Sequence, residues 1–475
     1  MDSFQALVDS LSGFVWGPYL LIPLLLGVGI YLMLGLRFMP VLALGHAFKH
    51  MWYGRKHGEG AEGELSPFNA LMTSMAATVG TGNIVGVATA IFVGGPGAVF
   101  WMWVTAIVGM ATKYCEALLA VKYREVTPSG NYVGGPMYYI KNGLGKKWSW
   151  LAALFAIFGA IACFGIGNMT QCNAITTNIV KTFAMDTWGM PFDMSYIVAG
   201  VLFLLVAVVI LGGVKRIGNV AGKLVPFMAI FYIIVGLVVV FMNLEKIPDV
   251  FRLIFGHAFS PMGAVGGFTG AVLSETIKRG VSRGLFSNEA GLGSAPIAHA
   301  TATTKNPVHQ GFLGMLDPFL DTIVVCTITA VVILISGEWT ASNVPADIAA
   351  QGTEATRGYL QGTLTARAFQ SVLPGGQILV TIGLVLFAYS TILGWSVYGE
   401  RCIIYLFGDK ASLPFRIIFV LAVPLGALAQ LDLVWALADL FNGLMALPNL
   451  IALIFLSPVV FRATKEYFVE MKKDD

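Results

Sequence analysis

The stretch AATVGTGNIVGVA, residues 76–88, lies in an apolar segment long enough to cross a membrane, but it is a poor sequence for a continuous helix. Gly80, Gly82 and Gly86 stand beside Thr and Asn residues at positions where Leu or Ile would favour a membrane helix. Each glycine lowers helix preference by about 1 kcal/mol relative to alanine. We therefore expect the helix to be interrupted here, for a reason that the rest of the chain has to explain.

The composition identifies the chain as an integral membrane protein. It has 475 residues, of which 57% are hydrophobic and 12% charged, and its mean hydropathy is +0.78. Soluble domains carry about 25% charged residues. The net charge of +3 gives no sign of a nucleic-acid partner. The amino terminus, MDSFQALVDS, has acids where a secretory signal has Lys or Arg, so the first apolar run is expected to be a retained helix.

Hydropathy predicts an all-α polytopic protein with eleven transmembrane helices in contact with membrane lipid. The expected spans are 14–36, 68–93, 97–121, 149–180, 195–213, 219–242, 263–303, 311–336, 374–400, 413–430 and 433–461. The loops on one side hold 18 Lys and Arg residues, whereas the two long loops on the other side, 243–262 and 337–373, hold 4. Because basic loops stay in the cytoplasm, we expect a bacterial-type plasma (inner) membrane protein with its amino terminus outside and its carboxyl terminus inside.

The span order suggests internal symmetry. If 14–36 is an extra amino-terminal helix, ten spans remain, and they divide into five-helix repeats of opposite orientation over 68–242 and 263–461, with a cytoplasmic tail at 462–475. Inverted repeats are typical of secondary transporters. The segment RGLFSNEAGLGSAPIA, residues 283–298, then occupies the same place in repeat two as the opening stretch does in repeat one.

An interrupted helix in a bilayer survives where its backbone lines a cavity or binds a solute. Unwinding of Thr78 to Gly82 would free carbonyl groups for a cation. The amides that begin the next half-helix, near Gly82 and Asn83, would face an anionic group. Together these groups suit a sodium ion and a carboxylate.

The alternative is that the three glycines form a close helix-packing face. The polar residues Thr81, Asn83, Asn288 and Glu289 favour a functional site, since polar groups inside a membrane usually mark function. The glycine spacing is GxGxxxG rather than the dinucleotide pattern GxGxxG, and the sequence has no Walker A motif. No enzymatic activity is therefore expected.

Three motifs carry a resemblance to a known family. GGPGAVFWMWVTAIVG at 94–109, TGNIVGVATA at 81–90 and RGLFSNEAGLGSAPIAHA at 283–300 resemble the alanine or glycine:cation symporter family, the sodium:alanine symporters. The similarity extends over residues 14–462. It implies a LeuT-type fold of two five-helix inverted repeats with one extra amino-terminal helix. It also implies sodium-coupled import of alanine or glycine, of either hand, by alternating access.

The resemblance also implies site residues. Family substrate contacts would fall on Thr81, Gly82, Asn83, Gln171, Thr391 and Trp395. By analogy with the wider fold, the sodium ion would bind the carbonyls of Ala76 and Val79 and the hydroxyls of Ser390 and Thr391.

Residue chemistry agrees with this assignment. Sodium is a hard cation that carbonyl and hydroxyl oxygens satisfy. The substrate ammonium needs acceptors, which Gln171 and loosened carbonyls from Ser287 and Asn288 to Gly291 could supply. Trp395 and Phe164 would line the pocket that holds the substrate's side chain. The alternatives are an interhelical hydrogen bond for Gln171 and ordinary packing for Trp395.

Other ionisable residues in the spans admit two readings. Asp317 and Asp321 could relay a proton or cation, as could Glu289, but pairing of the two aspartates with a nearby Lys or Arg is favoured. We expect Lys113 with Glu116, and Glu400 with Arg401, to be snorkelling pairs at span ends. His299 is expected to be a satisfied buried histidine.

Two alternative functions remain open at this point. One is a proton-coupled or broader-specificity amino-acid carrier on the same fold. The other is a channel or transport-inactive sensor, which is less favoured because the longest loop, 337–373, is too short to carry a soluble signalling domain.

Overall fold

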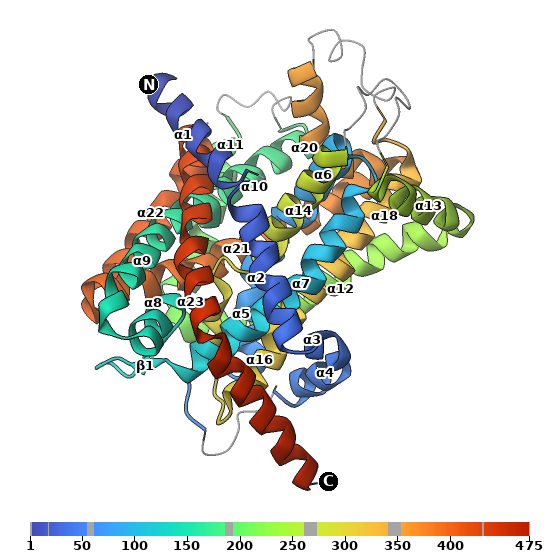
Figure 1. Cartoon of the computed structure of the whole chain (residues 1–475). Coiled ribbons are helices and arrows are strands. Elements are labelled where there is room, and N and C mark those ends of the chain that lie inside the picture. The colour runs from blue at the N-terminus through green and yellow to red at the C-terminus, as the bar shows by residue number, and fades with distance from the viewer. Residues whose placement is uncertain are drawn as a thin grey trace.

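The computed structural model describes residues 2–17, 19–54, 61–185, 193–260, 273–340, 353–429 and 432–474. Within these residues the protein is helical apart from one two-stranded antiparallel hairpin, in which β1 (Glu125–Val126) pairs with β2 (Tyr132–Val133). The helices form one bundle, with the amino terminus at one end and the carboxyl terminus at the other (Figure 1).

The first half of the chain contains α1 (Asp2–Val15), α2 (Leu21–Gly35), α3 (Met39–Leu42), α4 (Leu44–Tyr53), α5 (Pro67–Thr78), α6 (Val85–Gly94), α7 (Ala98–Lys122), α8 (Pro136–Tyr139), α9 (Ser149–Phe164), α10 (Thr170–Thr182), α11 (Ser195–Ile210), α12 (Gly213–Phe241) and α13 (Ile247–Ala258). The second half contains α14 (Leu273–Asn288), α15 (Ala295–His299), α16 (Pro307–Gly314), α17 (Leu316–Pro318), α18 (Thr327–Ser336), α20 (Thr353–Val372), α21 (Gly376–Phe407), α22 (Ser412–Leu428) and α23 (Asp432–Asp474). Short 3₁₀ or π-helical turns link several of them, at Thr81–Asn83, Ile140–Leu144, Lys146–Trp148, Gly165–Met169, Leu244–Lys246, Phe319–Cys326 and Asp409–Ala411.

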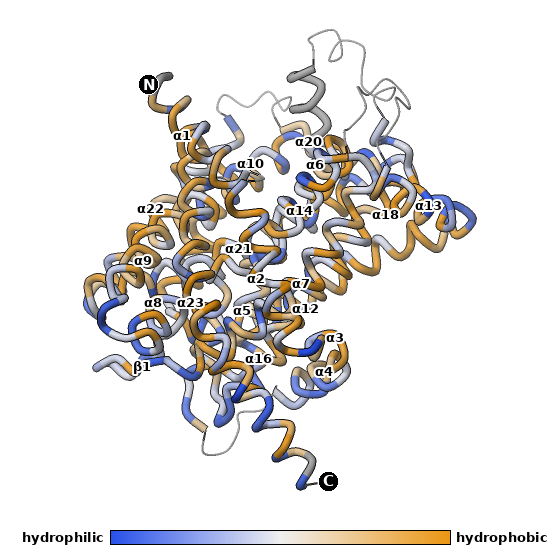
Figure 2. Tube along the Cα trace, viewed as in Figure 1, coloured by the Kyte–Doolittle hydropathy of each residue, from blue (hydrophilic) through white to orange (hydrophobic). Residues whose placement is uncertain are grey.

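The predicted polytopic helical membrane architecture is confirmed. Seven helices of the described residues are long and apolar enough to cross a membrane, and the bent pair Pro67–Thr78 with Thr81–Gly94 gives an eighth span. Shorter apolar helices occur at Phe4–Val15, Leu21–Gly35 and Ser195–Ile210. Apolar residues dominate the middle of the bundle, and polar ones gather toward its ends (Figure 2).

Several helix ends differ from the expected spans. The segment 14–36 is not one helix, because α1 ends at Val15 and α2 begins at Leu21, on either side of the helix-breaking pair Gly17 and Pro18. The helix α23 continues to Asp474, so the described part of the expected tail 462–475 is helical. Residues 263–272, the start of the expected seventh span, lie outside the described residues.

The two interrupted helices meet at the centre of the bundle. The first consists of α5 and α6, which are bent by 59° at the break, and the second consists of α14 and α15. The half-helix α5 packs against α15, and α6 packs against α14. The long helix α7 contacts both α14 and α16 (Figure 1). Each break therefore lies next to the other and is enclosed by neighbouring helices.

Backbone hydrogen bonds and one ion pair join two chain segments at one end of this centre. The amides of Glu64 and Leu65 donate to the carbonyl of Thr301 at 2.8 and 3.0 Å, and the amide of Thr303 donates to the carbonyl of Leu65 at 2.7 Å. Arg401 Nη2 lies 2.8 Å from Glu64 Oε1, and both side chains are buried. We call these contacts the 64–303 joint. It fastens the chain just before α5 to the chain just after α15.

A histidine cluster lies near the same end. His46 Nε2 is 2.9 Å from Tyr467 Oη, and His50 Nε2 is 2.9 Å from His46 Nε2. The His50 ring stacks on Phe312 with a centroid distance of 5.5 Å and an interplanar angle of 1°, and it lies 4.5 Å from the His309 ring. The cluster attaches α4 to α16 and α23.

Burial, followed by the nearby His309, His46 and Lys49, lowers the pKa of His50 from 6.5 to about 4. In the unfolded chain His50 takes up a proton near pH 6.5, but in the folded protein it stays neutral until about pH 4. The contribution of neutral, buried His50 to folding stability is therefore fully present above pH 6.5 and is lost as the pH falls toward 4.

We expect the His50→Phe variant, which keeps the stacking on Phe312, to lose less stability than the wild type between about pH 7 and pH 5. The difference should be about 1 kcal/mol after allowance for solvent around a half-buried group. Thermal unfolding in detergent across this pH range measures it. Parallel pH profiles for the two proteins would contradict the prediction.

Candidate functional site

Gly80, at the centre of the first break, leaves no room for a side chain. A Cβ on Gly80 would lie 2.6 Å from Thr391 Oγ1 of α21. The amide of Gly80 donates to Asn83 Oδ1 at 2.8 Å, which replaces the helical hydrogen bond that the break removes. The predicted interruption at this stretch is thus confirmed, and α21 packs directly against it.

The second break follows Asn288, the last residue of α14. Glu289 has φ +52°, and Gly291 and Gly293 have φ +89° and +83°. Left-handed backbone is easy for glycine and unfavourable for glutamate. The chain therefore turns away from the helix axis at Glu289 and resumes as α15 at Ala295.

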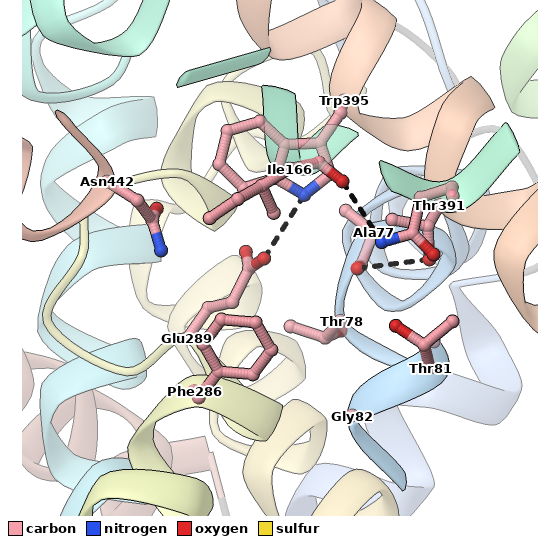
Figure 3. A pocket seen from close by; sticks show the side chains of 12 residues that line it. Ala77, Thr78, Thr81, Gly82, Ile166, Phe286, Glu289, Thr391, Trp395 and Asn442 are labelled. Atoms are coloured by element: carbon pink, nitrogen blue, oxygen red, sulfur yellow. Dashed lines mark hydrogen bonds between the residues drawn. The ribbon is translucent and has the colours of Figure 1, made fainter. Parts of the chain in front are cut away.

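A small pocket lies between the two breaks. It is lined by Ala77, Thr78, Gly80, Thr81, Gly82, Ile166, Gln171, Phe286, Glu289, Thr391, Trp395 and Asn442. Its volume of about 20 Å³ leaves room for roughly one water molecule. Figure 3 shows Trp395 above Glu289 and Phe286, with Asn442 on one side of the view and Thr81 and Gly82 on the other.

Five of the residues named as substrate contacts line this pocket: Thr81, Gly82, Gln171, Thr391 and Trp395. The other five do not. Phe164 instead packs against Phe415 and Phe419, with ring centroids 5.7 and 5.5 Å away, whereas Ile166, two residues further along the chain, lines the pocket.

Asn83, Ser287, Asn288 and Gly291 lie beside the pocket rather than in its lining. The Gly291 carbonyl accepts a hydrogen bond from Asn449 Nδ2 at 2.9 Å. Asn288 Nδ2 lies 3.3 Å from Thr322 Oγ1. These groups already have protein partners.

Two side-chain oxygens of the pocket have no hydrogen-bond partner among the described residues. They are Gln171 Oε1 and Asn442 Oδ1, on residues that are 6% and 2% exposed. Buried acceptors without partners are uncommon and call for an explanation. Asn442 was not predicted from the sequence, although an amide within the apolar span 433–461 is a signal of the kind that marks function.

The Glu289 carboxylate is the charged group of the pocket lining. Trp395 Nε1 donates to Glu289 Oε1 at 3.2 Å, and Ser294 Oγ donates to Glu289 Oε2 at 2.5 Å. Among the described residues, Glu289 forms no ion pair. The bond from Trp395 extends from α21 to the second break and closes the pocket (Figure 3).

A second polar cluster surrounds the Asp321 carboxylate next to the first break. Asn83 Nδ2 lies 2.6 Å from Asp321 Oδ1, and the hydroxyls of Ser287 and Thr322 donate to Asp321 Oδ2 at 2.8 and 2.7 Å. Asp321 has no ion-pair partner in the described part of the chain. The cluster gathers hydrogen-bond donors from both interrupted helices around a carboxylate of the π-helical stretch Phe319–Cys326.

The neighbouring Asp317 has a different environment. Lys113 Nζ lies 3.0 Å from Asp317 Oδ2, and both side chains are fully buried. Ser74 and Thr78 of α5 donate to the same carboxylate, each at 2.7 Å. The pair therefore connects α7 and α17 to the end of the first half-helix.

The expected snorkelling pairs are wrong. Lys113 bonds Asp317 rather than Glu116, whose Oε1 accepts from Asn449 Nδ2 at 2.6 Å. Glu400 pairs with Arg416 at 2.6 Å, and Arg401 belongs to the 64–303 joint. Local spacing suggested partners on one helix, whereas in each case the partner lies on another segment of the chain.

The residues named for sodium lie where α21 meets α5. The Thr391 hydroxyl is 3.5 Å from the Ala77 carbonyl and donates to the Phe387 carbonyl at 2.9 Å, and the Ser390 hydroxyl also donates to Phe387. Ala76 and Val79 are fully buried on either side of this contact. Carbonyl and hydroxyl oxygens of this kind suit a hard monovalent cation.

Comparison with known proteins gives consistent results. A model described as the sodium:alanine symporter family matches residues 1–475. The chain is 50% identical over 477 residues to the sodium/alanine symporter AgcS of Methanococcus maripaludis, covering 99% of each. It is 47% identical over 471 residues to an uncharacterized transporter of Haemophilus influenzae, covering 99% of this chain and 97% of the other.

A solved structure of MhsT in complex with L-phenylalanine also matches, with a TM-score of 0.50 and 13% identity. The match covers 85% of this chain and 98% of that one. At this identity the likeness concerns the fold alone, and it agrees with the expected LeuT-type architecture.

We predict that Lys113→Met destabilises the protein by about 3–5 kcal/mol, because it leaves the Asp317 carboxylate buried without its cation. The double variant Lys113→Met with Asp317→Leu should recover part of this loss. Thermal unfolding of the purified protein provides the measurement.

The matched control is Lys141→Met. Lys141 pairs with Glu125 at 2.8 Å, but both side chains are more than a third exposed, so its loss should cost at most about 1 kcal/mol. Equal effects of the two lysine substitutions would contradict the assigned role of burial.

Proposed function

We propose, because this chain belongs to the sodium:alanine symporter family, that the pocket between its two interrupted helices is where alanine binds during transport. The protein is a sodium-coupled alanine symporter. The observation that supports this location is that both breaks, together with Gln171 and Trp395, line one buried pocket. Transporters of this architecture bind substrate near the bilayer midplane between such half-helices.

We assign the substrate carboxylate to Thr81 and Gly82, in the 3₁₀ turn Thr81–Asn83 that leads into α6. Backbone amides at a helix start carry partial positive charge. Asn83 supports the turn by binding the Gly80 amide, and in this proposal it shapes the carboxylate site from behind.

The pocket suits a small side chain. About 20 Å³ is too little for a whole amino acid, so binding requires the indole of Trp395 and the second break to move apart. Glycine and either enantiomer of alanine require the least movement, and they are the substrates that we propose.

Sodium is proposed to bind the carbonyls of Ala76 and Val79 with the hydroxyls of Ser390 and Thr391. The Asp321 cluster offers a second position, since it places a carboxylate that has no ion-pair partner among the described residues next to Ser287 and Asn83. A cation there would balance the buried charge.

We further propose eleven spans arranged as two inverted repeats after the extra amino-terminal helix. The packing of α5 on α15 and of α6 on α14 supports this symmetry. The basic loops support a plasma membrane location with the carboxyl terminus and the 64–303 joint on the cytoplasmic side. Transport then proceeds by alternating access around the fixed pocket.

Proton coupling is a second candidate because Glu289 and Asp321 are buried carboxylates without ion-pair partners among the described residues. Such groups serve as proton carriers in other transporters. Sodium remains the first candidate on family grounds.

Purified protein in liposomes should accumulate labelled L-alanine when an inward sodium gradient is imposed. An equal potassium gradient, or a proton gradient alone, should give no accumulation, because the coupling ion is sodium. Uptake driven equally well by protons without sodium would refute sodium coupling and favour the proton-coupled alternative.

Trp395→Leu should widen the substrate range. Removal of the indole opens the side of the pocket opposite Thr81, so leucine and methionine should inhibit alanine uptake at least about tenfold more strongly than in the wild type. Competition of unlabelled amino acids against labelled alanine measures this.

The control for that substitution is Trp103→Leu. The Trp103 indole donates to Thr327 Oγ1 at 2.8 Å, away from the pocket, so the order of substrates should stay as in the wild type. An unchanged substrate range in Trp395→Leu would place the side-chain pocket elsewhere.

A further inference from the structure

Glu289 sits at a position that is unfavourable for a glutamate in three respects. Its amide closes the last turn of α14 by donating to the Leu285 carbonyl at 3.0 Å, so its carboxylate lies at the negative end of the helix dipole. Its backbone is left-handed, with φ +52°. The residue is 5% exposed. Costs of this kind persist where they serve a function.

The partners of Glu289 inside the protein are neutral. They are the Trp395 indole and the Ser294 hydroxyl, both of which donate hydrogen bonds. Lys113 pairs with Asp317. Ser74 and Thr78 donate further hydrogen bonds to that aspartate, and none of these groups forms a hydrogen bond with Glu289. Among the described residues no cation bonds the Glu289 carboxylate, and Lys113 acts on it only at longer range from its pair with Asp317.

Two further residues with buried acceptors line the same pocket. Gln171 Oε1 on α10 and Asn442 Oδ1 on α23 have no partner among the described residues, and both residues line the pocket with Glu289. An ammonium group has three N–H donors. Glu289 in the second break, Gln171 on α10 and Asn442 on α23 supply three acceptors, which match that number.

We propose that Glu289, with Asn442 and Gln171, forms the receptor for the substrate's α-ammonium group and selects amino acids over hydroxy acids and other carboxylates. This proposal rests on the proposed function, because it assigns one pole of the zwitterion in that same pocket. The carboxylate pole lies at Thr81 and Gly82, on the other side of the view in Figure 3. The pocket then has opposite polarity at its two sides, as the zwitterion has.

The Trp395 indole connects this recognition to opening of the pocket. Its N–H donates to Glu289 Oε1, an oxygen of the carboxylate that the ammonium approaches in this proposal. Arrival of the ammonium releases the indole from Glu289 Oε1, which removes the contact between α21 and the second break. A ligand with a hydroxyl in place of the ammonium offers one proton and no charge, so it leaves the carboxylate poorly compensated.

The test compares L-alanine with L-lactate, in which a hydroxyl replaces the ammonium group. Apparent affinities for both are measured by ligand-induced thermal shift of the purified full-length protein in saturating sodium. The wild type should prefer alanine by at least about 100-fold. Glu289→Gln should weaken alanine binding by about 10- to 100-fold, the range for a lost hydrogen bond to a charged group, while lactate affinity changes less than about threefold.

The matched control is Glu275→Gln. It makes the same carboxylate-to-amide change on α14, but Glu275 pairs with Arg279 at 2.6 Å outside the pocket. It should leave the ratio of alanine to lactate affinity as in the wild type. A purely structural effect of Glu289→Gln would weaken both ligands alike, and that result would overturn the proposal.

Asn442→Leu gives an independent test if Glu289→Gln does not fold. It removes an acceptor that has no partner in the described part of the chain, so it should preserve stability and lower the alanine-to-lactate ratio by about three- to tenfold. An unchanged ratio overturns the proposal. A shift in sodium dependence with an unchanged ratio also overturns it, because it places these groups in an ion site.

The proposed function is contradicted by a different result from the one that contradicts the ammonium assignment. If the wild type gives no alanine-dependent shift in sodium, the pocket is not a sodium-dependent alanine site. If the wild type responds to alanine but Glu289→Gln keeps the wild-type preference over lactate, only the ammonium assignment fails.

Discussion

The whole centre of the protein depends on one constraint, which is that backbone groups in a bilayer must find hydrogen-bond partners. Each helix break would leave amides and carbonyls exposed to hydrocarbon. Asn83 binds the Gly80 amide at the first break, and at the second break Asn449 and Glu116 bind the Gly291 carbonyl and the Gly293 amide. These side chains let two helices unwind side by side, and the unwound space becomes the pocket.

The same centre carries an imbalance of charge. Glu116, Glu289, Asp317 and Asp321 are buried around the breaks, and Lys113 neutralises one of them. Isolated buried charges are costly. A cation that enters with the substrate therefore relieves a cost already present in the empty protein, which gives sodium a physical reason to strengthen substrate binding.

Sequence reasoning succeeded where the signal was local. Glycines beside Thr81 and Asn83 predicted the first break, and Asn288 with Glu289 in a Gly-rich segment indicated the second. It failed for pairing between distant segments, because spacing along one helix suggested Glu116 for Lys113 when the partner is Asp317. Phe164 and Ile166 show a subtler limit, since the π-helical stretch Gly165–Met169 changes which residue of the helix faces the pocket.

The 64–303 joint has a mechanical consequence. It binds the residues before α5 to the residues after α15 through backbone bonds and the Arg401 contact with Glu64. These two half-helices are consequently joined at their far ends as well as packed together along the pocket. A tilt of one half-helix would strain the joint unless the other half-helix tilted with it.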